Sequence, residues 1–390
     1  MNIGIDKIGF YTPKQYIDMA TLGEARDVDP NKYIKGLGQE EMAVASEVDD
    51  AVTMAAQAAL SILNDVDKEA IDMVLVGSES GVDNSKSIAV WVHELTGINK
   101  HARAVELKQA CYGTTAAMKM AVGHIMMNTE SKVLVVGSDV AKYGLNTGGE
   151  PTQGAGAVAM LVAKDPSIAT INNDSATYTK SIPDFWRPLY SDYAMVDGHY
   201  SNSAYLDFLS QVWSQYKEKT GLSTKDFKTL LFHTPFTKMG KKALNKLAEV
   251  EKHSEIERLM AYYEASRYYN KKIGNIYTGS LYLSLISLLE QAENLESGDR
   301  IGLFSYGSGA VGEFFSIELV PGFRDALLTE NHEMQLSNRY ELNLEDYERA
   351  ISFSLPKDGS VYETNKNNVQ SGDVILEKID SHIRYYKTIS

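Results

Sequence analysis

The sequence predicts an α/β protein of two related halves, packed in layers about a pseudo-twofold axis. Two glycine-rich segments, GAGAVAMLV from Gly154 and GSGAVGEFF from Gly307, each continue into an apolar run typical of a strand. At nearly the same spacing, segments 71–79 and 227–235 have the composition of short buried strands that end near a titratable residue. Because the matches occur in the same order, we expect a duplication with halves at 1–170 and 171–390.

The other elements of each half follow the same order. The amphipathic segment CYGTTAAMKMAVGHIMM precedes an apolar strand at 132–139, and GNIYTGSLYLSLISLLEQAENL precedes one at 300–307. Segment 139–153 has no counterpart in the second half, which is typical of a surface or site loop. The acidic tail from about residue 321 predicts surface helices that cover the second half.

Composition excludes several classes of protein. A formal charge of −14 and a pI near 5.1 argue against a nucleic-acid-binding surface or an anionic membrane, because either would need a positive field. Cys111 is the only cysteine, so a disulfide within the chain and a cysteine-based zinc site are excluded, and a cytoplasmic location is expected. No signal peptide or membrane-spanning apolar run is present in the sequence.

Cys111 is a candidate nucleophile. It lies in KQACYGTTAAMKM, where small and hydroxylated residues lead into a helical pattern. A cysteine in the first turn of a helix would have its thiol pKa lowered by the helix dipole and the free N–H groups, which can also hold an oxyanion. A lone cysteine can equally be a small buried apolar residue.

His233 and Glu79 are candidate partners of the cysteine. Each closes a predicted strand, and α/β proteins place ligands at such strand ends. The pseudo-twofold axis would bring the two strand ends together, and burial would raise the pKa of Glu79 toward the range of a general base. Alone, each residue also fits a structural role, as a hydrogen-bonded core histidine or a solvated carboxylate.

Two further patterns concern ligands. The segment GSGAVG from Gly307 matches a dinucleotide fingerprint, but the β-like EFFSIELV follows it where a helix is required, so a nicotinamide or flavin site is rejected. Lys238, Lys241 and Lys242 form a local basic cluster in an acidic chain, which fits either a solvated helix face or a landing point for phosphates. Motifs for metal or nucleoside triphosphate binding are absent.

With these residues in place, the sequence resembles the bacterial 3-hydroxy-3-methylglutaryl-CoA synthases of the mevalonate pathway. The resemblance extends over nearly the whole chain and implies a thiolase-like fold, two pseudo-symmetric halves in a layered αβαβα architecture. It is carried by VDPNKY (28–33), VGSES around Glu79, KQACYGTTAA around Cys111, KYGLNTGGEPTQGAGAVAM, DFWRP (184–188), FHTPFTKMGKK around His233, GNIYTGSLYLSLISLLE and FSYGSGAVGEFF.

The resemblance also implies an acyltransferase reaction. Cys111 would take the acetyl group of acetyl-CoA, Glu79 would remove a proton from its methyl group, and His233 would hold acetoacetyl-CoA. Hydrolysis would release HMG-CoA, with no metal and no redox cofactor. The implied ligand contacts are Asn275 and Ser308 for the acyl part, Tyr143, Thr152, Asp184 and Ser201 for its pocket, and Asp29, Pro30, Lys238 and Lys242 for CoA. Thiolase-like proteins are generally dimers, so a homodimer is implied.

Three alternatives remain at this stage. A ketoacyl synthase of the initiating type would use Cys111 with His233 and Asn275, but it gains its carbanion by losing CO₂ and needs no base such as Glu79. A carrier-protein-dependent branching synthase would share all of these residues. A non-catalytic acyl-CoA-binding protein would not need the cysteine, histidine and glutamate together.

Overall fold

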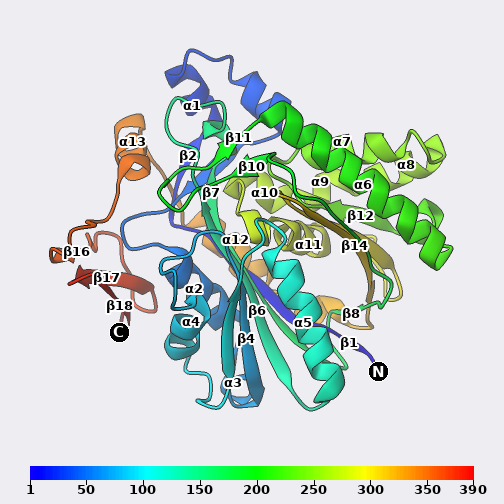
Figure 1. Cartoon of the computed structure of the whole chain (residues 1–390), viewed down its shortest axis with the longest axis horizontal. Coiled ribbons are helices and arrows are strands. Elements are labelled where there is room, and N and C mark those ends of the chain that lie inside the picture. Colours follow the sequence, from blue (N-terminus) through cyan, green and yellow to red (C-terminus); the bar gives the residue numbers. More distant parts are fainter.

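The centre of the molecule is a mixed β-sheet of ten strands, as seen in a computed structural model that describes residues 1–390 (Figure 1). The strand order is β12-β13-β14-β8-β1-β7-β6-β4-β5, with β9 paired to β14. These strands are β1 (Ile3–Tyr11), β4 (Ile71–Gly77), β5 (Arg103–Leu107), β6 (Lys132–Ala141), β7 (Gly154–Lys164), β8 (Ala169–Ile171), β9 (Ala176–Thr179), β12 (Thr229–Phe232), β13 (Arg300–Gly307) and β14 (Val311–Leu319).

The strand pairing repeats between the two parts of the sheet. β4 lies parallel to β6, and β6 lies antiparallel to β7. In the same way, β12 lies parallel to β13, and β13 lies antiparallel to β14. The segments that matched in sequence therefore occupy matching places in the sheet. The boundary near residue 170 stays a prediction, because β8 pairs with both β1 and β14 and the sheet continues through it.

Helices form three layers around these strands. The central helices α5 (Gly113–Met127) and α11 (Ser280–Gln291) touch each other where Thr115 Oγ1 and Tyr282 Oη lie 2.9 Å apart. Outside them, α2 (Ala51–Ile62) and α4 (Ile88–Thr96) pack on the first set of strands, and α6 (Gly198–Thr220) and α7 (Met239–Leu247) pack on the second. This is the layered αβαβα arrangement expected from the sequence.

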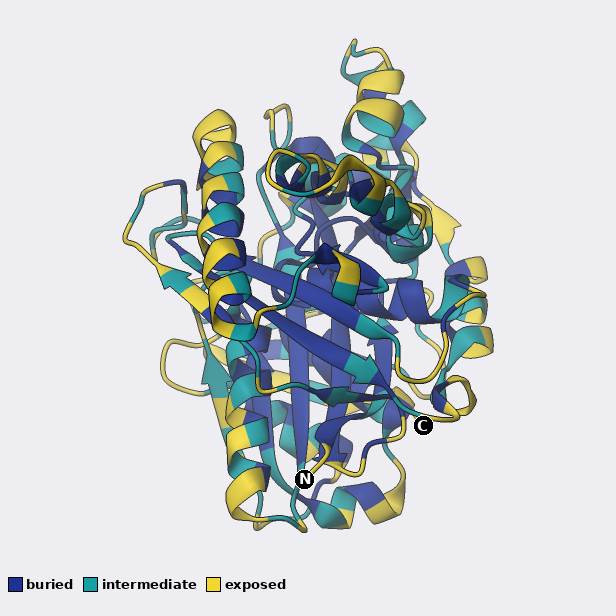
Figure 2. Cartoon of the chain, turned by 90° about the vertical axis from the view of Figure 1, so that its right-hand side faces the viewer, coloured by how far each residue is buried: buried dark blue, intermediate teal, exposed yellow.

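Side-chain alternation along the strands holds the layers together. Along β6, Val133 and Val135 belong to the core around α5 and α11, whereas Leu134 and Val136 belong to the core beneath α2 and α4. A strand covered on both faces needs such a continuous apolar run. Figure 2 shows the result, with the central strands largely dark blue and the yellow, exposed residues of the outer helices on their outer faces.

The expectation that the tail would cover the second half with helices is wrong. After α12 (Thr329–Ser337) and α13 (Leu344–Ser352), the chain forms a sheet of β16 (Tyr362–Glu363), β17 (Val374–Asp380) and β18 (Ile383–Thr388). This sheet packs on α2 and α4 of the first half, where Arg384 and Tyr386 bond Asp50 at 2.8 and 2.7 Å (Figure 1). Contacts between residues so far apart in sequence decide its position, and composition does not encode them.

Smaller elements complete the chain. They are β2 (Gln15–Asp18), β3 (Glu41–Val44) and β15 (Tyr340–Glu341), which form a sheet, the hairpin of β10 (Phe185–Trp186) and β11 (Met195–Val196), the π-helix η1 (Lys32–Leu37), and the helices α1 (Met19–Ala25), α3 (Asp65–Ala70), α8 (His253–Met260), α9 (Tyr263–Ser266) and α10 (Tyr268–Ile273). None of the helices has the length and apolar character that a membrane span requires.

Candidate active site

Cys111 and Glu79 form the centre of the candidate site. Glu79 follows the end of β4, and Cys111 lies two residues before the start of α5. The thiol donates to Glu79 Oε1 at an Sγ to Oε1 distance of 3.3 Å. Helix and strand approach this closely because residue 77 is glycine: a Cβ there would lie 2.3 Å from the backbone nitrogen of Thr114. The structure therefore brings together the two residues that the sequence singled out.

The expected thiolate is wrong for this state of the enzyme. Burial raises the pKa of Cys111 well above its usual value, and the negative charge of Glu79 raises it further. Burial also raises the pKa of Glu79 to about 8, helped by the charge of Asp139, which confirms the expected direction for that residue. Because Cys111 lies before the first residue of α5, the helix dipole lowers the thiol pKa less than burial and the neighbouring carboxylate raise it. The thiol keeps its proton and shares it with Glu79.

Asp139 is a site residue that sequence reasoning missed. It is fully buried and accepts hydrogen bonds from the Glu79 N–H at 2.8 Å, the Ser80 hydroxyl at 2.8 Å and the Thr278 hydroxyl at 2.6 Å. It therefore fixes the backbone of the base and joins it to the second half of the chain. A signal was available, because the parallel strands β4 and β6 pair Gly77 with Gly137, and the sequences Ser-Glu and Ser-Asp follow these glycines.

His233 lies in the same chamber. It follows β12, where its N–H donates to Phe304 O at 2.8 Å, and it is only 3% exposed. Burial lowers its pKa to about 3, so the ring is neutral at physiological pH. The Tyr205 hydroxyl donates to the carbonyl of His233 at 2.9 Å, and the pKa of Tyr205 is raised by burial and then by the nearby Cys111. Tyr205 thus bonds the backbone of His233 and lies within electrostatic reach of Cys111, a relation that the sequence did not reveal.

Two predicted ligand-binding side chains have a polar atom without a partner. His233 Nδ1 and the amide nitrogen of Asn275 are buried and make no hydrogen bond within the protein. The Asn275 oxygen is held by the Tyr277 N–H at 2.9 Å and the Ser280 hydroxyl at 3.0 Å, which orients the free amino group. Buried polar groups normally find partners. Atoms left free in this way are suited to hold the acyl oxygens of a ligand.

The turn with Ser308 and the aromatic residues form the wall of the chamber. Gln109, two residues before the nucleophile, donates to Ser308 O at 3.2 Å. Tyr143 packs edge-on against Phe185 and Tyr277, with ring centroids 6.2 and 6.3 Å away. The pKa of Tyr143 is raised, chiefly by burial, with smaller contributions from the charges of the neighbouring Cys111 and Glu79. Tyr143 and Ser308 therefore lie at the site, as the sequence predicted.

Asp184 is held by partners within the protein, and its expected place in the pocket wall stays a prediction. Asp184 is fully buried, and its oxygens accept from the Gly309 N–H and the Tyr306 hydroxyl, both at 2.8 Å. The Ser201 hydroxyl adds a longer contact at 3.4 Å. With its oxygens occupied, Asp184 supports the Ser308 turn from beneath. The Thr152 hydroxyl donates to Gly149 O at 2.8 Å and so also serves its own loop.

The residues expected to contact CoA come from two segments that lie side by side. The Lys238 N–H donates to Leu37 O at 2.9 Å, and Lys238 Nζ reaches Lys35 O at 3.0 Å. Asp29 and Pro30 lie just before this π-helix, and Lys242 is exposed with its Nζ 4.9 Å from the ring centre of Phe236. The structure therefore gathers these residues into one partly basic surface. Its role as a CoA site stays a prediction.

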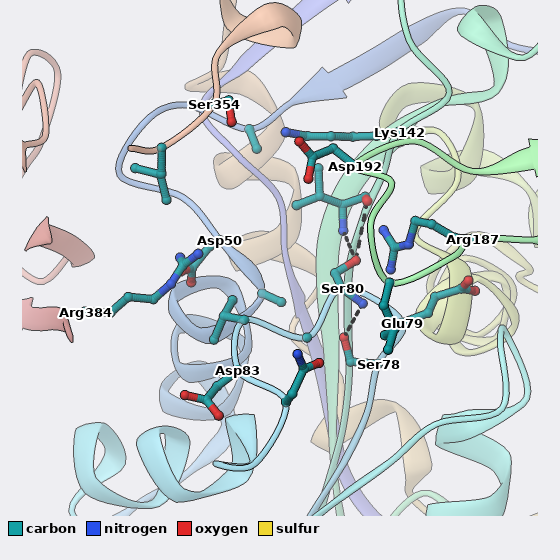
Figure 3. Close-up of a pocket in the computed structure, with 18 of the residues that line it drawn as sticks. Asp50, Ser78, Glu79, Ser80, Asp83, Lys142, Arg187, Asp192, Ser354 and Arg384 are labelled. Carbon is teal, nitrogen blue, oxygen red and sulfur yellow. Dashed lines mark hydrogen bonds and ion pairs between the residues drawn. The ribbon is translucent and has the colours of Figure 1, made fainter. Parts of the chain in front are cut away.

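The arrangement of the side chains also bears on metal binding. No group of three or more His, Cys, Asp or Glu side chains is placed to hold a metal ion. A cavity of about 1020 Å³ is lined by Glu79, Ala110 and Ser308, and Figure 3 shows Glu79 at its wall. The site as a whole combines a buried thiol, a carboxyl group with a raised pKa, and a neutral histidine.

Comparisons with known proteins agree with this chemistry. Profiles for the N-terminal and C-terminal parts of hydroxymethylglutaryl-coenzyme A synthase match residues 1–167 and residues 170–262 and 256–389. The chain is 53% identical to hydroxymethylglutaryl-CoA synthase of Enterococcus faecalis over 92% of its own length and 94% of that protein. It is 33% identical to the polyketide biosynthesis 3-hydroxy-3-methylglutaryl-ACP synthase PksG of Bacillus subtilis, covering 89% and 87%.

A solved structure, an HMG-CoA synthase complexed with CoA, superposes with a TM-score of 0.96 at 45% identity and covers 100% of both chains. The two chains thus share the same fold over their full length. The chain therefore belongs to the hydroxymethylglutaryl-CoA synthase family.

Proposed function

We propose that Cys111, Glu79 and His233 divide the steps of the hydroxymethylglutaryl-CoA synthase reaction, which converts acetyl-CoA, acetoacetyl-CoA and water into HMG-CoA and CoA. The observation that carries this proposal is the partly buried contact of 3.3 Å between the Cys111 thiol and the Glu79 carboxyl group. A nucleophile and a base within hydrogen-bond reach of each other, in a water-poor chamber, are what such chemistry requires.

The first step is acyl transfer to the cysteine. Sulfur of Cys111 attacks the carbonyl carbon of acetyl-CoA, the bond to the CoA sulfur breaks, and the thiol proton leaves with CoA as its S–H. Because the pKa of Cys111 is raised, this proton must be accepted as the new bond forms. The carboxylate of Glu79 already accepts the S–H hydrogen bond and can take the proton.

The second step makes the carbon–carbon bond. Glu79 removes a proton from the methyl group of the acetyl-cysteine, and the enolate carbon attacks the C3 ketone of acetoacetyl-CoA. The oxygen formed at C3 takes a proton back, and neutral His233 orients this substrate through a nitrogen that is free in the structure. Water then cleaves the Cys111 thioester, which releases a carboxylate and restores the thiol.

Thiol release from acetyl-CoA, with and without acetoacetyl-CoA, tests the proposal. Without the second substrate, CoA release should stop near one equivalent per enzyme apart from slow hydrolysis, and acetoacetyl-CoA should restart it. A decarboxylating ketoacyl synthase would instead consume a malonyl-carrier substrate. If acetoacetyl-CoA does not accelerate thiol release, the proposed division of steps is wrong.

A carrier-protein substrate is the second candidate, since PksG is named as an ACP synthase. Free CoA thioesters are favoured by the lysines on the surface beside η1, because CoA presents phosphates at its adenine end and these lysines are exposed. The higher identity to the Enterococcus faecalis enzyme points the same way. A ratio of kcat/KM for acetyl-CoA over acetyl-carrier well above one is expected, and the reverse ratio would favour the carrier.

We also infer a homodimer. Strand β5 is the last strand of the sheet, pairs only with β4, and leaves Val105 50% exposed. An open edge of this kind invites pairing with another strand, and a second copy of β5 would fit. The substitution Val105→Lys should convert a dimer into a monomer in light scattering. A wild-type mass of about 43.2 kDa would refute the dimer. The free thiol of Cys111 is compatible with a cytoplasmic location.

A further inference from the structure

The cavity of about 1020 Å³ has Glu79 in its wall (Figure 3), together with Ser308 and with Ala110, the neighbour of Cys111 in the sequence. Its walls come from the loop after β4, the start of α2, the β10–β11 hairpin and the C-terminal segment, which are four regions far apart in sequence. The C-terminal segment, whose role the sequence left open, therefore helps to enclose the surroundings of the base. The C-terminal segment thus forms part of the cavity wall and does more than cover the surface of the first half.

Arg187 enters this cavity from the hairpin. The chain just before it is held firmly, because Asp184 bonds Gly309 and Tyr306, and Phe185 packs on Tyr277 with ring centroids 5.9 Å apart. Its side chain is partly buried and makes no hydrogen bond or ion pair with the protein. In Figure 3, it lies on the same side of the cavity as Glu79, and its charge acts on that carboxyl group.

The other cations of the cavity act on other groups, and the exposed Lys108 acts on Glu106. Arg384 pairs with Asp50 at 2.8 Å, and Lys357 pairs with Asp192 at 2.7 Å. The amino group of Lys86 lies 4.0 Å from the centre of the Trp91 ring. The pKa of Lys142 is lowered, chiefly by burial, while Asp192 raises it and Arg187 lowers it further. Lys142 is not among the groups that shift the pKa of Glu79. Arg187 is therefore the cation of this cavity that faces the base.

The charges around Glu79 show why a cation matters there. From β6, Asp139 opposes ionisation of the base, as does burial, whereas the Cys111 thiol and Arg187 favour it. Once Cys111 carries an acetyl group, its S–H can no longer donate to the carboxylate. At the moment when Glu79 must act as a base, Arg187 is thus the remaining group that stabilises its charge.

We propose that Arg187 is a positioning residue for condensation, which stabilises the carboxylate form of Glu79 through the cavity and so keeps the base available in the acetyl-enzyme. This inference rests on the role of Glu79 proposed above. The guanidinium acts through Glu79 and is not itself required to touch the substrate. Its effect should therefore appear in the ionisation of Glu79 before it appears in substrate affinity.

The sign of the effect follows from the charge. Ionised Glu79 is the active form, so the rate of condensation rises as the pH passes upward through the pKa of about 8. A neutral residue at 187 removes the stabilising cation, which moves this rise to higher pH. A nearby opposite charge typically shifts a carboxyl pKa by about one unit or more, so we expect a shift of about one pH unit and a rate about tenfold lower on the acid side.

The test measures condensation of isolated acetyl-enzyme with acetoacetyl-CoA in a single turnover, over a pH range that brackets the rise. The variants are Arg187→Gln, Arg187→Lys as the conservative rescue, and Lys142→Gln as a matched control that removes another cation of the same cavity. We expect Arg187→Gln to move the midpoint of the rise to higher pH and Arg187→Lys to return it close to the wild-type midpoint. We expect Lys142→Gln to leave the midpoint unchanged. The melting temperature of each variant checks folding.

The results distinguish a failure of the role proposed for Arg187 from a failure of the role proposed for Glu79. If Arg187→Gln acetylates and condenses with the pH profile of the wild type, or if Lys142→Gln shifts the profile equally, the role of Arg187 is refuted. If the wild-type acetyl-enzyme fails to condense at any pH, the proposed role of Glu79 is refuted, and the inference about Arg187 falls with it. A rise that moves only in Arg187→Gln supports the proposal.

Discussion

The substitution Glu79→Gln tests the coupling between base and nucleophile most directly. Gln keeps the size of the side chain and an oxygen that can accept the thiol hydrogen bond, but it has no charge and cannot remove a proton. The variant should still become acetylated by acetyl-CoA, but more slowly, because the thiol remains and has lost the carboxylate that takes its proton. It should fail to condense. Loss of a positioned general base costs about 10²- to 10⁴-fold in rate, so condensation should fall by that factor.

The raised pKa also sets the behaviour of the wild type. With a pKa of about 8 in place of the usual 4.5, only about one Glu79 in eleven is ionised at about pH 7. Wild-type condensation should therefore rise about tenfold between that pH and its alkaline plateau. In Glu79→Gln this rise should disappear, because the group that produces it has been removed.

The thiol supplies an independent readout. The charge of Glu79 and its hydrogen bond are both causes of the raised pKa of Cys111, so Glu79→Gln should lower that pKa. Alkylation by iodoacetamide, followed against pH, reports the thiolate of the single cysteine. The variant should react at lower pH than the wild type, and Glu79→Asp, which keeps the charge, should shift less.

Two outcomes would contradict this reasoning. Condensation at the wild-type rate in Glu79→Gln would make Glu79 a structural residue. An alkylation profile that does not move would show that the carboxyl group and the thiol are not electrostatically coupled, whatever their distance.

Three further predictions concern other parts of the site. Labelled acetyl-CoA alone should leave one acetyl group on the wild type and none on Cys111→Ala, and equal label on both proteins would exclude the proposed nucleophile. The variant His233→Ala should raise the KM for acetoacetyl-CoA and keep the same rise with pH, because burial holds the pKa of His233 near 3; loss of the rise would assign it to the histidine instead. A Cβ at residue 307 would lie 2.4 Å from Gln109 O, so Gly307→Ala should slow acetylation by pushing the nucleophile loop, and an unchanged acetylation rate would show that the loop adapts.

Much of the fold could be predicted because its signals are local or repeated. Apolar runs at Ile71 and Lys132 become β4 and β6, and their likeness to β12 and β13 indicates a duplicated pairing pattern. Glu79 and Cys111 were identified for similar reasons, since each stands at the end of an element with a clear pattern. The tail was misjudged because its place depends on Asp50, more than 300 residues earlier in the chain.

The amino-acid sequence by itself predicted the layered α/β class, the order of the elements, and Cys111, Glu79 and His233 as candidate site residues, because periodicity and strand ends are properties of short segments. Only the tertiary structure decided the protonation of the site. The thiol keeps its proton and Glu79 has a raised pKa because burial and the charge of Asp139 surround them, and burial is created by packing of distant segments. The same packing placed Arg187 in the cavity beside Glu79, a relation between residues 108 positions apart that no local pattern could reveal.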